Sequence, residues 1–269
     1  MKITLILIIS ELPFNRSNFI FNQCKKKIIY TCIIGNYDIL RSIKSRDSNW
    51  RYICFTDQIF EAIGWEIRKI PDELIYLDNT RKARALKILP HLFLEPYDEC
   101  IWIDGNIEIM GSIEKFVAEE IDRNHIFAIP KHPERICIYQ EGQEVIRLKK
   151  ENTSSIRNQI KKYEKEKYPR NWGLVQSQLI YRKNEESIKK LCEIWWGEIL
   201  YRSQRDQMSF NYAFWKSPLH KVKLLDPRFL IDSPFFRYWH HCNPKSVPSV
   251  LNISRNYGKM SNLLNGEFI

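Results

Sequence analysis

The sequence lacks the marks of several common protein classes. No two glycines stand two residues apart, so the glycine-rich phosphate loop expected of a nucleotidyltransferase is missing. No RNA-binding aromatic signature, zinc-finger spacing or basic leucine-zipper pattern occurs. No apolar stretch approaches the length that spans a bilayer. These absences argue against a nucleotidyltransferase, a motif-based nucleic-acid reader and a membrane-spanning protein.

The cysteines show no regular spacing. Seven are scattered along the chain without a CxxC pair. Cys54 stands between Ile53 and Phe55, inside an apolar run where free cysteine behaves as a small hydrophobe. An odd, scattered set predicts a reducing compartment, and we expect a cytoplasmic protein.

The N-terminus begins like a secretory signal. Lys2 is followed by the apolar run from Ile3 to Ile9, but Glu11 and the missing small-residue cleavage site argue against secretion. We expect residues 1–26 to form a leader or an edge strand. No linker, internal repeat or low-complexity segment divides residues 27–269, which predicts one domain.

The chain is basic, with a formal net charge of +10, while its hydrophobic fraction of 44% is that of an ordinary globular protein. Such a charge suits nucleic acid, an anionic membrane surface or a diphosphate-bearing substrate. The plain alternative is a solvated basic surface.

Hydrophobic patterning predicts strands that alternate with helices. Strands are expected at residues 27–34, 50–55, 65–70, 99–103, 107–110, 126–129 and 174–181. Helices are expected at 81–94, after Ser112, within 135–167, at 185–200 and from about 205, and Pro90 should kink or shorten the first. The alternation predicts an α/β fold with a mostly parallel central sheet.

The most informative motif is Asp104-Gly105-Asn106, which follows the apolar strand Glu99 to Ile103. Ligands of open α/β sheets bind at the carboxyl ends of strands. Carboxylate and amide oxygens there suit Mg²⁺ or Mn²⁺ on a nucleotide diphosphate. An ordinary tight turn is the alternative reading of the same tripeptide.

Four segments carry a resemblance to a known family. They are residues 29–38, residues 52–57, residues 87–91 together with 101–106, and residues 205–210. In order and spacing they resemble the glycosyltransferase-like family that includes plant mucilage-related and turgor-regulation proteins, long labelled a domain of unknown function. Lys131-His132-Pro133-Glu134-Arg135 and Glu141 also fit the pattern. The resemblance covers roughly residues 28–216.

This resemblance implies a GT-A-like, single-domain α/β/α sandwich over residues 27–269. An Asp-x-Asp-type element of that fold holds a divalent metal against a nucleotide sugar. The present chain has Asn106 at the third position, and an uncharged amide oxygen predicts weaker metal binding. Asp104 is therefore the expected main ligand. His240 and His241 lie in the tail, and the family analogy offers His241 to complete the metal shell.

Cationic side chains should neutralise the diphosphate. Arg81, Arg84 and Lys87 recur at every third residue and share a broad helical face. The resemblance favours Arg84 and Lys87 as diphosphate ligands and leaves Arg81 open between that role and a solvated basic face.

The nucleoside and the sugar need contacts of their own. Asp57 ends a strand at the same sheet edge and could accept a hydrogen bond from base or ribose, with Thr31 and Tyr37 alongside; an Asx turn is the alternative. Asp206 is the candidate general base or positioner of the anomeric carbon, and Gln207 could contact the sugar. A looser capping pattern, Ser203-x-x-Asp206, is the alternative.

The family analogy also gives His132, Arg135 and Glu141 to the donor or acceptor pocket, where a surface salt-bridge network is the alternative. Trp195 and Trp196 are expected in the core.

The sequence thus predicts a metal-dependent glycosyltransferase that moves a hexose from a nucleotide diphosphate sugar, with UDP favoured, to a glycan or lipid-linked acceptor in surface polysaccharide biosynthesis. The basic surface would hold it against an anionic inner leaflet. A catalytically inactive nucleotide-sugar or glycan-binding module of the same fold is the main alternative, and Asn106 favours it. A nucleic-acid-binding protein is a further alternative.

Overall fold

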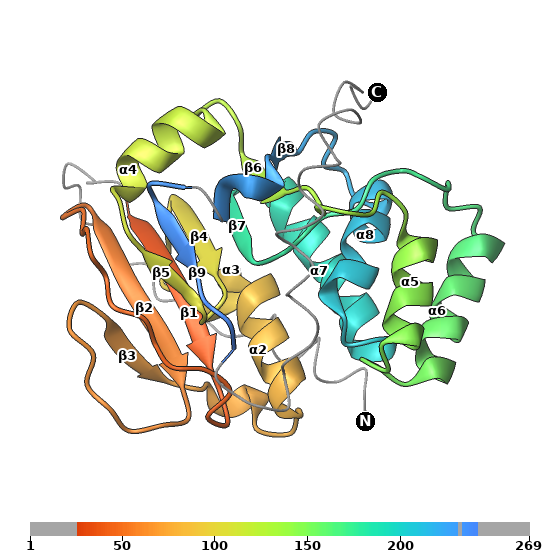
Figure 1. Ribbon diagram of the computed structural model, residues 1–269, viewed down its shortest axis with the longest axis horizontal. Coiled ribbons are helices and arrows are strands. Elements are labelled where there is room, and N and C mark those ends of the chain that lie inside the picture. Colours follow the sequence, from red (N-terminus) through yellow and green to blue (C-terminus); the bar gives the residue numbers. More distant parts are fainter. Residues whose placement is uncertain (1–25, 231–232, 242–269) are drawn as a thin grey trace.

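The computed structural model describes residues 26–230 and 233–241 (Figure 1). Almost all of the predicted leader, residues 1–25, lies outside this description.

A mixed sheet forms the centre of the described structure. Its seven strands follow the order β3-β2-β1-β4-β7-β6-β8. The bounds are β1 Lys27–Ile33, β2 Trp50–Thr56, β3 Glu66–Lys69, β4 Glu99–Ile103, β6 Phe127–Pro130, β7 Leu179–Lys183 and β8 Lys223–Leu225. β7 runs antiparallel to its neighbours β4 and β6, and the remaining pairs are parallel. The predicted α/β class with a mostly parallel sheet is confirmed.

The central strands are buried on both faces, which explains their unbroken apolar sequences. All five residues of β4, Glu-Cys-Ile-Trp-Ile, are buried, and β1 is buried at six of its seven positions. Continuous β-branched and aromatic residues are typical of parallel strands that are covered on both sides.

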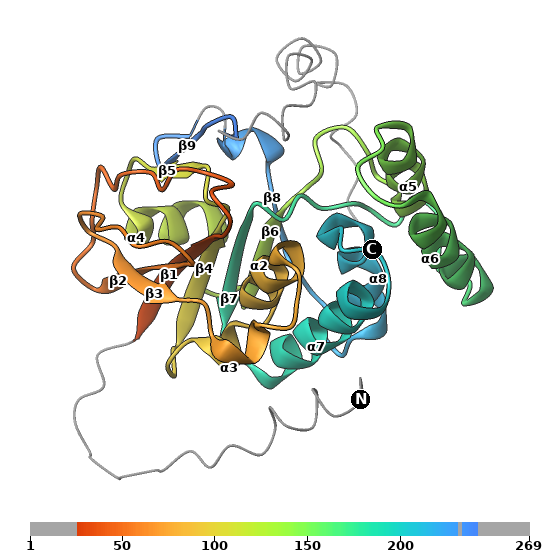
Figure 2. The same ribbon diagram turned by 90° about the horizontal axis from the view of Figure 1, so that it is seen from below.

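Helices cover one face of the sheet. They are α2 Asn79–Ile88, α3 Pro90–Phe93, α7 Glu186–Tyr201 and α8 Phe210–Lys216 (Figure 2). Trp195 of α7 is fully buried in this layer, and Trp196 is nearly so. Both tryptophans belong to the core, as predicted.

The opposite face carries α4 Ile113–Phe116, its continuation Val117–Ile121, and a second sheet made of β5 Ile107–Ile109 and β9 Phe236–Tyr238 (Figure 2). Phe116 packs against Phe235 and Phe236 there. The layers therefore form an α/β/α arrangement.

Residues 135–167 contain helices, as predicted. They are α5 Ile138–Arg147 and α6 Thr153–Lys165, which pack with α8 around the buried rings of Tyr163 and Tyr212. Figure 1 shows this pair at the end of the molecule away from β3. Three short helical turns complete the described elements: η1 Asp72–Leu74, η3 Asp206–Met208 and η4 Pro227–Leu230.

Two predicted boundaries need correction, and two strands were not predicted. The strand expected from residue 174 begins only at Leu179, because a turn at Ser177 and Gln178 interrupts it without a Gly or Pro signal. The helix expected at 81–94 ends at Ile88, and Pro90 begins a separate turn. β8 and β9 come from the tail, where the sequence predicted no strand. Within the described helices, none is long and apolar enough to cross a membrane.

Candidate active site

The site begins with helix α2, which brings Lys87 to the carboxyl edge of the sheet. Asp78 caps the helix by accepting a hydrogen bond from the Arg81 backbone N–H at 2.9 Å. Lys87 lies in the last turn and is only 1% exposed. A buried lysine requires partners for its charge, so the groups around the Lys87 ammonium define the site.

Two carboxylates bind the buried Lys87. Its Nζ lies 3.1 Å from Asp104 Oδ1 and 2.7 Å from Asp206 Oδ2. Asp104 follows β4, whereas Asp206 begins the η3 turn. The end of a strand and the start of a helical turn, far apart in sequence, therefore meet at one ammonium group. The structure thus brings Lys87, Asp104 and Asp206 together.

Neighbouring side chains complete this ion-paired cluster. Trp102 Nε1 donates to Asp104 Oδ1 at 2.8 Å. Ser177 Oγ donates to Asp206 Oδ2 at 2.7 Å and accepts from Lys87 at 3.2 Å. Each buried charge thereby gains at least one further hydrogen bond, as buried ions require. We call Arg84, Lys87, Asp104, Ser177 and Asp206 the lysine cluster.

The surroundings of Asp206 favour the ionised form of its carboxyl group. Burial by itself would raise its pKa, but the charges of Arg84 and Lys87 and the hydrogen bonds from Lys87 and Ser177 hold that pKa well below its usual range. Arg84 lies 3.4 Å from Asp206 Oδ2. The capping alternative fails, because Ser203 Oγ instead accepts from the Arg205 N–H and Asp206 Oδ2 faces the lysine cluster.

Arg81 does not join the lysine cluster. Its guanidinium pairs with Asp78 at 2.8 Å and donates to the carbonyls of Ile199 and Arg202 at the end of α7. Arg81 therefore ties two helices together, and its three-residue spacing from Arg84 does not place both side chains at one site.

The C-terminal segment closes over Asn106. Asn106 is fully buried; its Nδ2 donates to the Trp239 carbonyl at 2.7 Å, and the Trp239 N–H donates back to the Asn106 carbonyl at 2.9 Å. Trp239 Nε1 also donates to Glu108 at 2.9 Å, and Arg41 lies 4.8 Å from the Trp239 ring centroid. These contacts fix the chain two residues before His241.

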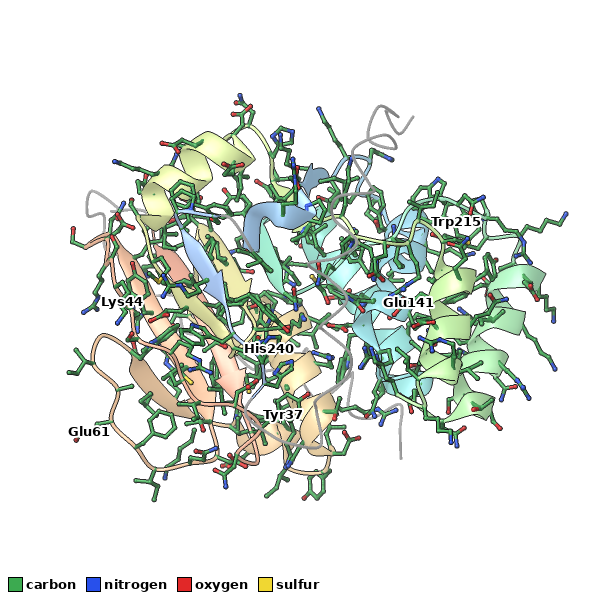
Figure 3. All side chains as sticks on the ribbon, viewed as in Figure 1. Tyr37, Lys44, Glu61, Glu141, Trp215 and His240 are labelled. Carbon is green, nitrogen blue, oxygen red and sulfur yellow. The ribbon has the colours of Figure 1, made fainter. Side chains whose placement is uncertain are left out.

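His241 lies against the loop after β1. Its Nδ1 is 2.7 Å from Asp38 Oδ2, and its ring centroid is 5.0 Å from that of Tyr37. Burial alone would lower the His241 pKa, but the hydrogen bond to Asp38 and the charges of Asp38 and Asp104 raise it above the usual value. His241 and Asp104 therefore share one electrostatic environment. Figure 3 labels Tyr37 and the neighbouring His240 in the middle of the view.

The residues predicted to hold a metal suit a hard divalent cation. Asn106 Oδ1 is buried without a hydrogen-bond partner among the described residues, and an orphaned amide oxygen is a ready cation ligand. Asp104 is 24% exposed in its side chain, and Lys87 and Trp102 both bind its Oδ1, not its Oδ2. Within residues 26–230 and 233–241, no three His, Cys, Asp or Glu side chains form a metal cluster by themselves. A cation at this position would therefore need the amide oxygen of Asn106 in addition to the carboxylate of Asp104.

The predicted nucleoside residues lie around the end of β1. Both carboxylate oxygens of Asp57 accept the Gly35 N–H, at 3.1 and 3.0 Å, so Asp57 holds the neighbouring loop instead of forming its own Asx turn. Gly35 has φ of +65°, a conformation that favours glycine. Thr31 is 1% exposed, and its Oγ1 has no hydrogen-bond partner in the described chain. Tyr37 is 45% exposed.

His132, Arg135 and Glu141 form a second cluster. Arg135 Nε donates to Glu141 Oε2 at 2.7 Å, and His132 Nδ1 accepts from the backbone N–H groups of Glu134 and Arg135. Burial and the charge of Arg135 lower the pKa of His132 to about 3, so His132 is neutral near pH 7. Glu141 is only 4% exposed, which excludes the surface salt-bridge alternative.

The segment before β7 links the two clusters. The His132 N–H donates to the Leu174 carbonyl at 2.8 Å, and Gln176 donates to the Pro130 carbonyl at 2.9 Å. Ser177 follows directly and contacts Lys87 and Asp206. Gly142 on α5 also faces Met208, since a Cβ added there would lie 3.2 Å from Met208 Cε. The two clusters therefore flank the same η3 turn.

Comparison with known proteins identifies the family. The model of the TOD1/MUCI70 glycosyltransferase-like domain matches residues 14–225, most of the chain. The chain belongs to this family. The resemblance found in the four sequence segments is thereby confirmed.

A curated protein and a solved structure are similar to this chain. The chain is 25% identical over 218 residues to the "Probable hexosyltransferase MUCI70" of Arabidopsis thaliana, which covers 70% of this chain and 37% of that protein. A similar solved structure is that of the WbbM bifunctional glycosyltransferase, at 13% identity and a TM-score of 0.43, covering 78% of this chain and 40% of that one. The chain thus spans less than half the length of either protein.

Several site residues of this TOD1/MUCI70-family chain escaped the sequence reasoning. Ser177 carries no motif, and only the folded chain brings it to Lys87 and Asp206. Asp38 ends the first matched segment, and its type and position could have marked it as a candidate. Trp239 lies in the tail after the matched residues, where no pattern indicated a contact with Asn106.

Proposed function

We propose that the chain is a metal-dependent glycosyltransferase that moves a hexose from a nucleotide diphosphate sugar to a glycan or lipid-linked acceptor. The observation that carries the proposal is the buried Lys87, held between Asp104 and Asp206 where the carboxyl end of β4 meets the start of η3. Membership of the TOD1/MUCI70 family and the likeness to a probable hexosyltransferase support the reaction class.

Breaking the sugar–phosphate bond places negative charge on the departing diphosphate. Lys87 is fixed by its two carboxylates before any substrate arrives, and a preorganised cation stabilises developing charge without further rearrangement. Arg84, with a side chain 21% exposed, supplies a second cation beside Asp206. Asp104, Asn106 and His241 would hold Mn²⁺ or Mg²⁺, which supplies Lewis-acid stabilisation of the same charge when bound.

Asp206 suits a positioning role better than a general-base role. A carboxyl group whose pKa lies far below neutrality is a weak base toward a hydroxyl group. It is also ion-paired with Lys87 and Arg84 and only 4% exposed. We therefore assign Asp206 to the orientation of both cations and Gln207, the next residue, to contact with the sugar.

The remaining predicted residues surround this centre. Thr31, Tyr37 and Asp57 would contact the nucleoside, with UDP as the favoured donor. The His132, Arg135 and Glu141 cluster would bind sugar or acceptor hydroxyl groups from the other flank of η3.

Hydrolysis of UDP-sugars with and without Mn²⁺ tests the proposal. The wild-type chain and the control Lys161→Met, on the exposed face of α6, should hydrolyse a UDP-hexose slowly when Mn²⁺ is present, and Lys87→Met should not. EDTA should abolish the activity. Loss of activity in K161M to the same degree as in K87M would remove the site assignment.

A catalytically inactive binding module of the same fold is the second candidate. Asn106 favours it, since its amide nitrogen is already engaged by Trp239 and the residue brings no charge to a metal. Such a module would raise its melting temperature with UDP-sugars but show no hydrolysis under any metal condition.

We also propose that the α5–α6 segment contacts an anionic membrane on the cytoplasmic side. Residues 147–170 contain nine lysines and arginines against three glutamates, a large share of the net charge of +10. Arg157, Lys161 and Lys165 are exposed at four-residue spacing on α6. Sedimentation with phosphatidylserine vesicles should fall when these three become Glu, whereas binding that is equal with neutral vesicles would contradict this contact.

A further inference from the structure

Asp38 and His241 form a part-buried pair, two residues beyond the contact of Trp239 with Asn106. Asp38 is 8% exposed, lies five residues beyond the end of β1, and approaches His241 Nδ1 at 2.7 Å. Asp38 follows the loop that Asp57 and Gly35 hold in place. These hydrogen bonds hold the backbone that leads to Asp38, and the short Asp38 side chain lies close to that backbone.

His241 is placed from the other side by a separate set of contacts. Trp239, two residues earlier, exchanges two hydrogen bonds with Asn106 and donates a third to Glu108. Ser42, on the same loop as Asp38, donates to Glu108 at 2.8 Å. The loop after β1 and the segment after β9 thus meet at Asn106 and at Glu108 of β5, and the Asp38–His241 contact joins the same two segments.

The chemistry of the pair fixes the imidazole tautomer. A carboxylate only accepts hydrogen bonds, so the proton on the ring must lie on Nδ1. Nε2 of a neutral His241 is then left with its lone pair, which is the form that ligates a metal. A carboxylate that binds the distal nitrogen of a metal-bound histidine orients the ring and raises its basicity.

We propose that Asp38 is a positioning residue that holds His241 with Nε2 available to the divalent cation. This inference rests on the metal-dependent function proposed above. It adds a residue, a contact and a tautomer that the sequence resemblance did not assign. Asp38 acts through His241 in this view and does not itself bind the cation.

Mn²⁺ binding by the full chain tests the proposal without reference to activity. Titration of Mn²⁺ alone, followed by the electron paramagnetic resonance of the free ion, should give an apparent Kd about 10 to 100 times higher for Asp38→Ala and Asp38→Asn than for the wild type. Asp226→Asn, which changes a carboxylate paired with Arg228 and outside the predicted metal set, is the matched control and should leave the Kd unchanged.

A double-variant cycle separates positioning from direct ligation. His241→Ala should weaken Mn²⁺ binding at least as much as D38A, and D38A combined with H241A should be no weaker than H241A alone, because Asp38 acts through the removed ring. A further loss in the double variant would show that Asp38 ligates the ion directly and would overturn the positioning role.

Histidine NMR gives a readout that needs no metal. At a pH where the ring is neutral, the ¹⁵N shifts of His241 in the wild type should report protonation at Nδ1, and in D38A this preference should be lost while the melting temperature stays close to that of D226N. If wild-type protein binds no Mn²⁺, the metal part of the proposed function fails and this inference fails with it. If wild type binds Mn²⁺ and D38A binds equally well, only the role of Asp38 is refuted.

Discussion

Asn106 and Trp239 bind each other reciprocally, with the Asn106 amide donating at 2.7 Å to the Trp239 carbonyl and the Trp239 N–H donating at 2.9 Å to the Asn106 carbonyl. The pair joins the turn between β4 and β5 to the residue that follows β9. It also explains the departure from Asp-x-Asp at this position, since a carboxylate there could not donate to a carbonyl. The side-chain nitrogen of Asn106 thus holds Trp239, whereas its Oδ1 has no hydrogen-bond partner among the described residues.

Asn106→Asp should therefore destabilise the protein. The change removes a buried donor and sets a carboxylate against the Trp239 carbonyl, which should lower the free energy of unfolding by about 1–3 kcal/mol. Urea denaturation measures this loss, and Asn184→Asp, at an exposed position, is the control. An unchanged or higher stability would mean that the Asn106–Trp239 pair contributes nothing to holding β9.

Lys87→Met should be more damaging than its position at a helix end suggests. Removal of the ammonium leaves Asp206 buried with only Arg84 opposite, and breaking a buried ion pair costs about 3–5 kcal/mol. Turnover of a UDP-hexose should fall about 100-fold to 1000-fold, as for loss of a preorganised donor. Urea denaturation and hydrolysis assays measure the two effects separately. Lys190→Met, exposed on α7, should change neither.

Ser177→Ala tests a residue that sequence reasoning missed. The hydroxyl donates to Asp206 and accepts from Lys87, so its loss should reduce stability by about 1 kcal/mol. The two charged groups lose a shared neighbour, and we expect kcat to fall at least several-fold while KM changes little. Ser154→Ala on α6 provides a solvent-facing comparison. Wild-type kcat in S177A would exclude Ser177 from the working site.

The acid sensitivity of the fold should depend on Glu114. Burial alone would raise its pKa, but hydrogen bonds from Lys27 and Trp50 and the charges of Lys27 and Arg123 lower it to about 2, from an ordinary value of 4.5. A carboxyl with a depressed folded-state pKa stabilises the protein above the unfolded value and loses that contribution as pH falls. The contribution of Glu114 should therefore disappear between pH 4.5 and about 2.

Thermal melts of Glu114→Gln across this range measure the effect. The variant should be less stable than wild type at pH 6, and the difference should shrink as the pH falls toward 2. Because the Glu114 side chain is 37% exposed, solvent screens the pairs and added salt should reduce the difference as well. Glu193→Gln, exposed on α7, should show no such convergence. A constant difference at every pH would separate Glu114 from acid unfolding.

Local sequence determined most elements of this protein. Ser112 caps the helix that it was expected to begin, and Pro90 divides the helix expected at 81–94, because capping and proline geometry act within a few residues. The apolar runs of β1, β2 and β4 could be recognised in the same way, since strands covered on both faces have continuous hydrophobic sequences. Because the end of β4 could be recognised, the position of Asp104 directly after that strand could be predicted as well.

Tertiary structure alone decided which of these residues meet. Lys87 and Asp206 are far apart in the chain, as are Asp38 and His241, and no periodicity encodes such contacts. Arg81 and Arg84 lie three residues apart on the same helix. Arg81 nevertheless donates to a carbonyl at the end of α7, whereas Arg84 lies beside Asp206. Local patterns report the interactions of near neighbours, whereas a buried charge is placed by whatever partners the complete fold brings within reach.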